Sequence, residues 1–253
     1  MQLEILIPIL FFIGFATLLQ TLSGFGFGLL VVSSFTLFNL LPLTATTFVV
    51  SALGLFNSST LVFKNLHQVN RRAFMYILLP GIPFMAVGFA ILELLSAGLS
   101  AWLNILLGVA ILFCCALLML RRKNATPSGR AWGFAVAGSI GGLLGGMFST
   151  FGPPVVFQCY RQRWPVNEIR FTLLAVFSVT AVIRLAMVPF GTLPSQITLL
   201  STLIALPVVM ISTQLGRYLS HKLSPQVVRR IALVMLSFSG ITLIVKYSPI
   251  ILL

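Results

Sequence analysis

The sequence predicts an all-α polytopic membrane protein with an inverted-topology repeat. In each half we expect a broken, re-entrant helical hairpin followed by three transmembrane helices. The first observation behind this fold class is composition: of 253 residues, 58% are hydrophobic and 8% are charged, and the mean hydropathy is +1.09. Soluble domains carry about 25% charged residues. The other two observations are long apolar stretches with glycine-rich interruptions, and an uneven distribution of basic residues among the connections.

The apolar stretches approach or exceed the roughly 20 residues that a helix needs to cross a hydrocarbon core. Eight of them follow one another along the chain, at 5–40, 45–63, 73–95, 100–120, 131–158, 171–190, 196–216 and 231–248. Six have the length of a single membrane-spanning helix, whereas 5–40 and 131–158 are longer. These two segments therefore need a separate explanation.

Fourteen of the 16 Lys and Arg residues lie in four connections, at 64–72, 121–130, 161–170 and 217–230. Because short loops rich in these residues stay in the cytoplasm, we expect all four on the cytoplasmic side and both termini on the outer, periplasmic side. Segments 5–40 and 131–158 must then start and end on one side. The 28 residues of the second make about 42 Å of straight helix, too short for two full crossings. Both segments are therefore predicted to enter the membrane and turn back.

Each predicted hairpin carries glycine near its middle. The first contains the run Gln-Thr-Leu-Ser-Gly-Phe-Gly-Phe-Gly at 20–28, and the second contains Ser-Thr-Phe-Gly-Pro-Pro at 149–154. Glycine frees the backbone and proline removes a hydrogen-bond donor, so helices are expected to stop here. Broken backbone at membrane depth is tolerated where it is buried in protein or lines a wet cavity. The glycine pairs within 141–146 fit this interpretation and fit GxxxG helix packing equally well.

The two halves of the chain, 1–123 and 131–253, resemble each other weakly across a cytoplasmic linker at 124–130. Ser23-Gly24-Phe25-Gly26 aligns with Ser149-Thr150-Phe151-Gly152, and Pro83 aligns with Pro207. The basic and base-free connections exchange places between the halves. Homologous halves of opposite charge bias indicate an inverted-topology repeat, which secondary transporters use with the substrate near the midplane, where broken helices meet.

The breaks also predict the sign of the ligand. A half-helix that starts inside the membrane turns unpaired N–H groups and a positive dipole end toward the cavity, which favours an anion. Arg184 lies within an apolar span without an acidic partner in that span, so it is either a counter-charge for the anion or a side chain that snorkels to the nearby surface. The predicted substrate-binding residues are Gln20, Ser23, Gly24, Gly26, Gly28, Asn57, Ser149, Thr150, Gly152, Pro153 and Arg184.

The inventory of reactive side chains does not favour an enzyme. The chain has no Asp, two His and three Cys, and it lacks the ligand set of a metal hydrolase and the acid of a Ser-His-Asp triad. We therefore predict no cofactor and no metal. The expected partners are a small anionic substrate and membrane lipid, without nucleic acid, and a homodimer is kept open. Coupling to an ion would have to use Glu93, the substrate's own proton or backbone ion sites.

Two of these motifs carry a resemblance to a known family. The run at 20–28 resembles the first-half signature of the TauE/SafE sulfite exporter family. The run at 141–154, followed by Tyr160 and Glu168-Ile-Arg-Phe-Thr172, resembles its second-half signature. The resemblance implies a bacterial inner-membrane carrier of sulfite, sulfoacetate or related organosulfur anions. An anion-permeable channel, or a transporter of another small solute, is the alternative.

Overall fold

The computed structural model describes residues 3–96, 98–119, 131–219 and 225–252. Within them every regular element is a helix, which confirms the all-α prediction. The elements are α1 (Leu3–Ser23), α2 (Phe27–Leu37), α3 (Leu43–Val62), η1 (Phe63–Gln68), α4 (Arg71–Ser96), α5 (Ser100–Met119), α6 (Ala131–Phe148), α7 (Gly152–Tyr160), α8 (Val166–Met187), η2 (Val188–Phe190), α9 (Gln196–Leu219) and α10 (Pro225–Leu252). Among the described helices, seven are long and apolar enough to cross a membrane, so the chain is a multi-pass membrane protein.

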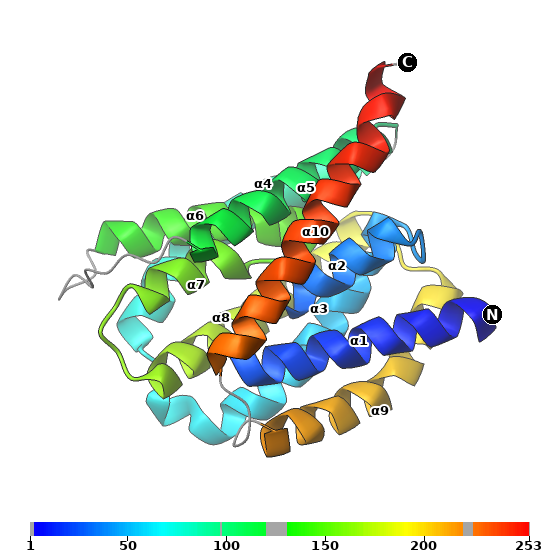
Figure 1. The fold of residues 1–253 in the computed structure, drawn as a ribbon. Coiled ribbons are helices and arrows are strands. Elements are labelled where there is room, and N and C mark those ends of the chain that lie inside the picture. Colours follow the sequence, from blue (N-terminus) through cyan, green and yellow to red (C-terminus); the bar gives the residue numbers. More distant parts are fainter. Residues whose placement is uncertain (1–2, 97, 120–130, 220–224, 253) are drawn as a thin grey trace.

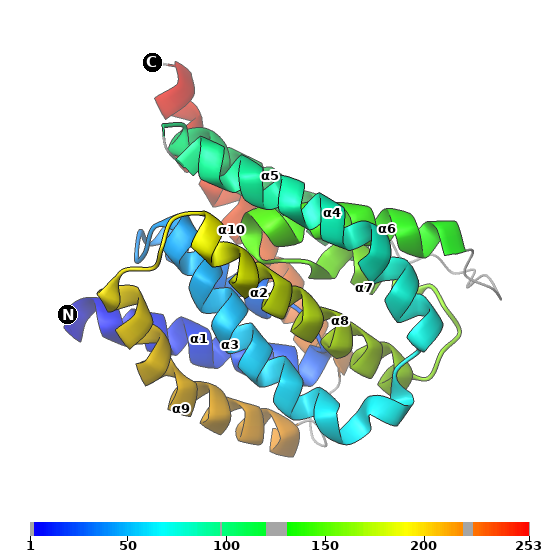
Figure 2. The same cartoon turned by 180° about the vertical axis from the view of Figure 1, so that it is seen from behind.

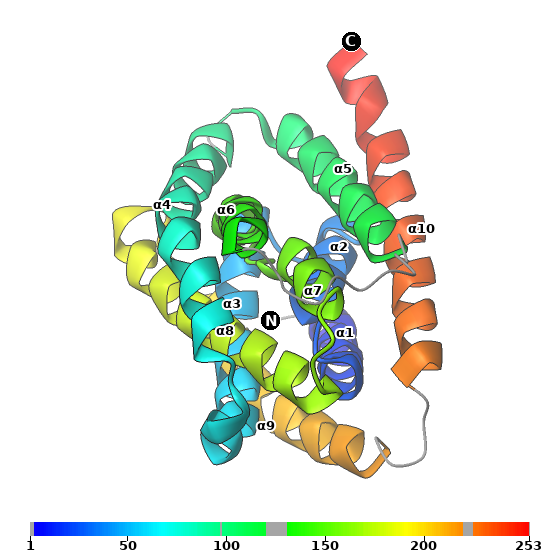
Figure 3. The ribbon, with the colours of Figure 1, turned by 90° about the vertical axis from the view of Figure 1, so that its left-hand side faces the viewer.

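The helices break where the glycine and proline runs predict. Segment 5–40 forms α1 and α2 around residues 24–26, and segment 131–158 forms α6 and α7 around residues 149–151. In each pair the second helix packs against the first and returns toward the end of the bundle from which the first one started (Figure 1). Figure 3 shows these four hairpin helices inside a ring formed by α4, α5, α10, α9 and α8. The two hairpins therefore occupy the middle of the protein.

The halves share one order of elements, a hairpin followed by three long helices. Their neighbours also correspond. Helix α4 of the first half packs on α6, and its counterpart α9 packs on α1, while α5 packs on α10 and α3 packs on α8. Equivalent helices thus contact equivalent partners across the interface between the halves.

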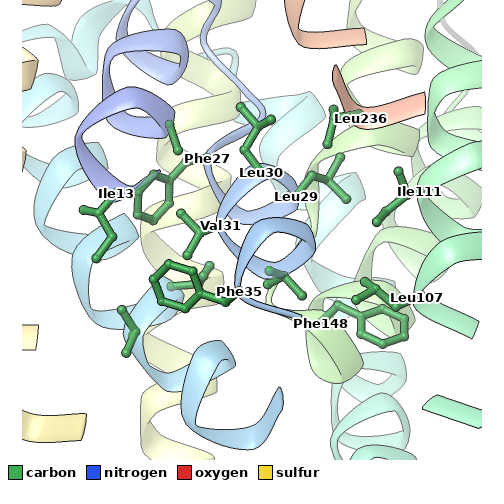
Figure 4. Close-up of a cluster of buried hydrophobic side chains, with 14 of the residues drawn as sticks. Ile13, Phe27, Leu29, Leu30, Val31, Phe35, Leu107, Ile111, Phe148 and Leu236 are labelled. Carbon is green, nitrogen blue, oxygen red and sulfur yellow. The ribbon is translucent and has the colours of Figure 1, made fainter. Parts of the chain in front are cut away.

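The largest apolar core surrounds α2. Nine of its eleven residues are buried, and its leucine, valine and phenylalanine side chains meet Ile13 of α1, Leu107 and Ile111 of α5, Phe148 of α6 and Leu236 of α10 (Figure 4). A helix that is apolar around its whole circumference is stable only when protein or lipid covers every face. Protein covers α2, which places the start of this short helix deep inside the bundle.

The glycines of α6 pack rather than interrupt the helix. On one face, a Cβ atom added at Gly138, Gly142 or Gly146 would collide with backbone carbonyl oxygens of α4. On another face, a Cβ at Gly141 would lie 2.8 Å from the carbonyl oxygen of Phe151, and one at Gly145 would lie 2.8 Å from its ring. Small residues allow this close approach of backbones. The glycine pairs of α6 therefore let α4 and the hairpin tip approach, and the helix itself continues to Phe148.

Connections of different charge lie at opposite ends of the bundle (Figure 2). The turn η1 and the connection 161–165 lie at one end, which we call the basic end. The connections 38–42 and 188–195 lie side by side at the other, base-free end. The name refers to the connections alone, because the last turns of α10 bring Lys246 to this end, where its ammonium donates to the Leu37 carbonyl at 2.9 Å. The N-terminus lies at this same end (Figure 1).

Helix α8 begins earlier than its apolar pattern predicts, at Val166 instead of 171, with Pro165 as its N-cap. Glu168 and Arg170 consequently belong to the helix and not to a loop. The Glu168 carboxylate accepts a hydrogen bond from the Asn70 amide at 2.8 Å, and Arg170 donates to the carbonyl of Thr21 in the last turn of α1. Glu168 and Arg170 thus hold the first turn of α8 against neighbouring segments.

Candidate functional site

The first break is a backbone conformation that glycine favours. Gly24 has φ +82° and Gly26 has φ +99°, in the left-handed region that side chains with a Cβ atom rarely adopt. Gly26 is the N-cap of α2, and the first bond of the new helix runs from the Leu30 N–H to the Gly26 carbonyl at 3.0 Å. The N–H groups of the three residues between them have no partner inside the helix. They form the positive end of the α2 dipole.

The second break is held by α3. Ser149 has φ +53°, and its hydroxyl donates to the Thr47 carbonyl at 2.9 Å and lies 3.0 Å from the Ser51 hydroxyl. Helix α7 then starts at Gly152, with Pro153 in its first turn. Proline suits this position because its missing N–H would be unpaired there anyway. The prolines therefore open the new helix.

The two breaks meet inside the bundle. A Cβ atom added at Gly28 would lie 2.9 Å from the Ser149 carbonyl oxygen, so only a glycine permits this approach. A cavity of about 70 Å³ lies beside the contact, between α3 and α8. We call it the central cavity. Eight of the eleven predicted binding residues line it: Gln20, Gly26, Gly28, Ser149, Thr150, Gly152, Pro153 and Arg184.

Of the other three predicted residues, Asn57 and Gly24 do not line the cavity. Asn57 lies behind the cavity wall, where its amide donates to the Gln20 oxygen at 2.6 Å and its oxygen accepts from the Thr213 hydroxyl at 2.7 Å. A Cβ at Gly24 would face the Arg170 side chain at 3.4 Å, and the side chain of Ser23 lies outside the described residues. Since the Gln20 oxygen is occupied by Asn57, the NH₂ group is what Gln20 can offer a ligand.

Arg184 is the one charged residue among the described residues that line the central cavity. Its side chain is 3% exposed, so it does not snorkel to the surface. The guanidinium donates to the Thr47 hydroxyl at 3.1 Å and lies over the Phe89 ring, 4.5 Å from the centroid, while Nε has no hydrogen-bond partner. A buried cation with an unused donor is costly unless a ligand completes its coordination.

A second, larger cavity lies on the other side of Arg184. It measures about 340 Å³ and is lined at the base-free end by residues of the connections 38–42 and 188–195, together with Phe89, Glu93 and Arg184. We call it the vestibule. Because Arg184 lines both cavities, it forms part of the partition between them.

Several residues of the central cavity are not among those predicted. Ser51, Gly54 and Ser58 come from α3, and Thr180 and Ala181 from α8. Their spacing is a signal that sequence patterns contain: small residues at intervals of three and four share one helix face. Thr180 and Ala181 lie four and three residues before Arg184 and so share its face. The serine at 58, rather than the asparagine at 57, lies on the cavity side of α3.

The arrangement resembles an anion site in its chemistry. It combines a fixed cation, unpaired N–H groups at the start of a half-helix, an amide NH₂ and several hydroxyl groups in a small buried space. Helix termini and broken helices of this kind bind ions at the centre of secondary transporters.

The chain is similar to known membrane transport proteins. The sequence profile of the sulfite exporter TauE/SafE family matches residues 9–243. A probable sulfite/organosulfonate exporter TauE of Cupriavidus necator is 34% identical over 235 residues, which cover 92% of each chain. A probable inner membrane transporter protein TsaS of Comamonas testosteroni is 32% identical over 181 residues, covering 71% of this chain and 74% of the relative. No solved structure matches. A match over this length of the chain shows that the protein belongs to the TauE/SafE sulfite exporter family.

Proposed function

We propose that the protein is a secondary transporter that moves a small sulfur oxyanion, sulfite or an organosulfonate, across a bacterial inner membrane by alternating access. The observation that carries the proposal is the central cavity, in which two helix breaks from different halves meet beside the buried cation of Arg184. The printed names of the two relatives, an exporter of sulfite or organosulfonate and an inner membrane transporter, support the substrate class and the location.

The size of the central cavity favours the smaller members of this class. One water needs about 10–15 Å³ of cavity volume, so the central cavity of about 70 Å³ accommodates roughly five to seven water-sized groups. Sulfite, with its four heavy atoms, fits this space. Sulfoacetate has twice as many and requires the cavity to widen, for example toward the vestibule.

The proposed mechanism uses the two halves, 1–123 and 131–253, as an inverted-topology repeat. The exchange of helix partners between the halves supports a two-fold relation between them. Since each hairpin returns to its starting side and is followed by three long helices, the second half starts on the opposite side, and the axis would lie in the membrane plane. We assign the basic end to the cytoplasm by the positive-inside rule, which places both termini and the vestibule on the periplasmic side. Rocking one half against the other around the central cavity would then expose it to each side in turn.

Flux of ³⁵S-labelled sulfite into sealed proteoliposomes tests the proposal. We expect saturable uptake that is accelerated by unlabelled sulfite on the opposite side, because exchange through a carrier returns a loaded site. A flux that rises linearly with concentration and lacks this acceleration would assign a channel. Movement of a cation without any sulfite flux would contradict the assignment of an anion transporter.

A further inference from the structure

The vestibule is lined by two side chains of opposite charge, Glu93 and Arg184. Among the described residues that line it, Glu93 of α4 and Arg184 of α8 are the only titratable side chains. The lining parts of α3, α9 and the connections 38–42 and 188–195 contribute apolar and hydroxyl side chains. Glu93 is therefore the one acidic side chain among the described residues of the vestibule.

The Glu93 carboxylate is held away from Arg184 by the connection 188–195. One carboxylate oxygen accepts from the Thr192 N–H at 3.0 Å and from the Thr192 hydroxyl at 2.7 Å. Gly191 permits this docking, because a Cβ atom there would lie 2.6 Å from both the Glu93 carboxyl carbon and the Phe89 ring. The connection thus lies directly on Phe89 and Glu93.

The same helix face supports Arg184. Phe89 lies one turn before Glu93, and its ring packs against the Arg184 guanidinium, whose central carbon is 4.5 Å from the ring centroid. The Nε atom of Arg184 is buried without a hydrogen-bond partner. An arginine in this state attracts an anionic oxygen strongly, because little water competes for its donors. Two kinds of anion can reach it from the vestibule: the substrate and the carboxylate of Glu93.

We propose that Glu93 is a gate on the vestibule side of the site, a tethered carboxylate that competes with the substrate anion for Arg184. This inference rests on the proposed function. When ionised, Glu93 moves between Thr192 and Arg184, and in the second position it occupies the partition between vestibule and central cavity. When the carboxylate takes up a proton from water, the neutral acid still accepts from Thr192 and no longer competes. Substrate binding is then stronger at low pH than at high pH.

Sulfite binding to the purified full-length protein in detergent micelles tests the gate. The dissociation constant is measured by titration calorimetry from about pH 3 to about pH 8, a range that begins below and ends above the usual titration of glutamate carboxyls in proteins. Glu93→Gln keeps an oxygen for Thr192 and removes the charge. Sulfite itself also changes protonation, but the ratio of the wild-type constant to that of Glu93→Gln at each pH cancels this effect. We expect a ratio near one at the lowest pH and about tenfold weaker wild-type binding at the highest.

A second variant should change the dissociation constant for sulfite in the opposite direction. Thr192→Val removes the hydroxyl that holds the carboxylate away from Arg184, so it should bind sulfite more weakly than wild type at high pH and equally well at low pH. Glu168→Gln removes an acid at the basic end and serves as the matched control, with no pH-dependent change in the ratio. If Glu93→Gln does not fold, Thr192→Val alone carries the test.

The outcomes separate the gate from the transporter. A wild-type protein that binds sulfite, with a Glu93→Gln ratio independent of pH, overturns the gate and leaves the proposed function intact. Wild-type-like binding by Thr192→Val at high pH also overturns it. A wild-type protein that binds no sulfite at any pH contradicts the proposed function itself.

Discussion

Replacement of Arg184 by glutamine should remove most of the affinity for sulfite and leave the fold intact. An anion about 4 Å from the guanidinium gains about 4 kcal/mol at an effective dielectric constant of about 20. Since each 1.4 kcal/mol is a factor of ten, losing the whole term would weaken binding by about 10³. Water and the remaining N–H groups recover part of it, so we expect at least about 100-fold weaker binding for Arg184→Gln. Arg184→Lys keeps a charge and loses the planar fork, so its loss should be about tenfold.

The stability of the protein should change much less. Arg184→Gln removes two contacts that stabilise the fold, the hydrogen bond to Thr47 and the contact with the Phe89 ring. It also removes the destabilising cost of burying a charge. The Thr47 hydroxyl keeps its bond to the Thr44 carbonyl at 2.8 Å. These opposing effects should hold the change in the free energy of unfolding within about 2 kcal/mol.

The assay is calorimetric titration of sulfite, with the thermal unfolding of each variant measured in the same detergent. Arg163→Gln is the control, because it removes one exposed basic residue at the basic end and should leave the dissociation constant unchanged. A folded Arg184→Gln protein that binds sulfite within a factor of two of wild type would refute the assignment of Arg184 as the counter-charge.

Three further predictions concern glycine and asparagine positions. Gly142→Ala forces a Cβ atom against the backbone of α4 and should lower the free energy of unfolding by about 1–3 kcal/mol. Gly98→Ala is the control, because its Cβ atom would meet nothing within 4 Å. Thermal unfolding compares the two variants. Gly26→Ala places a Cβ atom at φ +99°, which should strain the first break by about 1–2 kcal/mol although no atom lies within 4 Å of it. We expect this variant to reduce sulfite flux more than Gly152→Ala, whose Cβ atom would make ordinary contacts. Equal flux through the two variants would contradict the role of the first break. Asn57→Leu leaves the buried amide oxygen of Gln20 unpaired and should lower the free energy of unfolding by about 1–3 kcal/mol. An unchanged melting temperature would show that water replaces the hydrogen bond from Asn57.

The helix breaks show how far local signals extend. The left-handed φ angles at Gly24 and Gly26 and the proline turn that opens α7 depend on the residues at those positions, so the sequence predicts both interruptions to within a few residues. The start of α8 was harder to predict. Its first turn carries Glu168 and Arg170, and contacts with Asn70 and Thr21 accommodate these charges, which a hydropathy pattern reads as a loop.

The candidate site shows where such signals stop. A periodic pattern places Asn57 and Ser58 one residue apart on α3, and only the packing against α1 and α9 turns the serine to the cavity and the asparagine behind it. The glycine pairs of α6 are equally ambiguous until α4 is seen to lie against them.

By itself the sequence determined the membrane environment, the helical class and the positions of the two breaks, because hydropathy, chain length and backbone freedom are properties of short segments. The tertiary structure alone decided which residues meet. It brought the breaks of two distant hairpins to one cavity, buried Arg184 beside Thr47 and Phe89 instead of at the surface, and set Glu93 in the same vestibule. The physical reason is that the surroundings of a buried charge come from helices far apart in the chain, and no single segment encodes them.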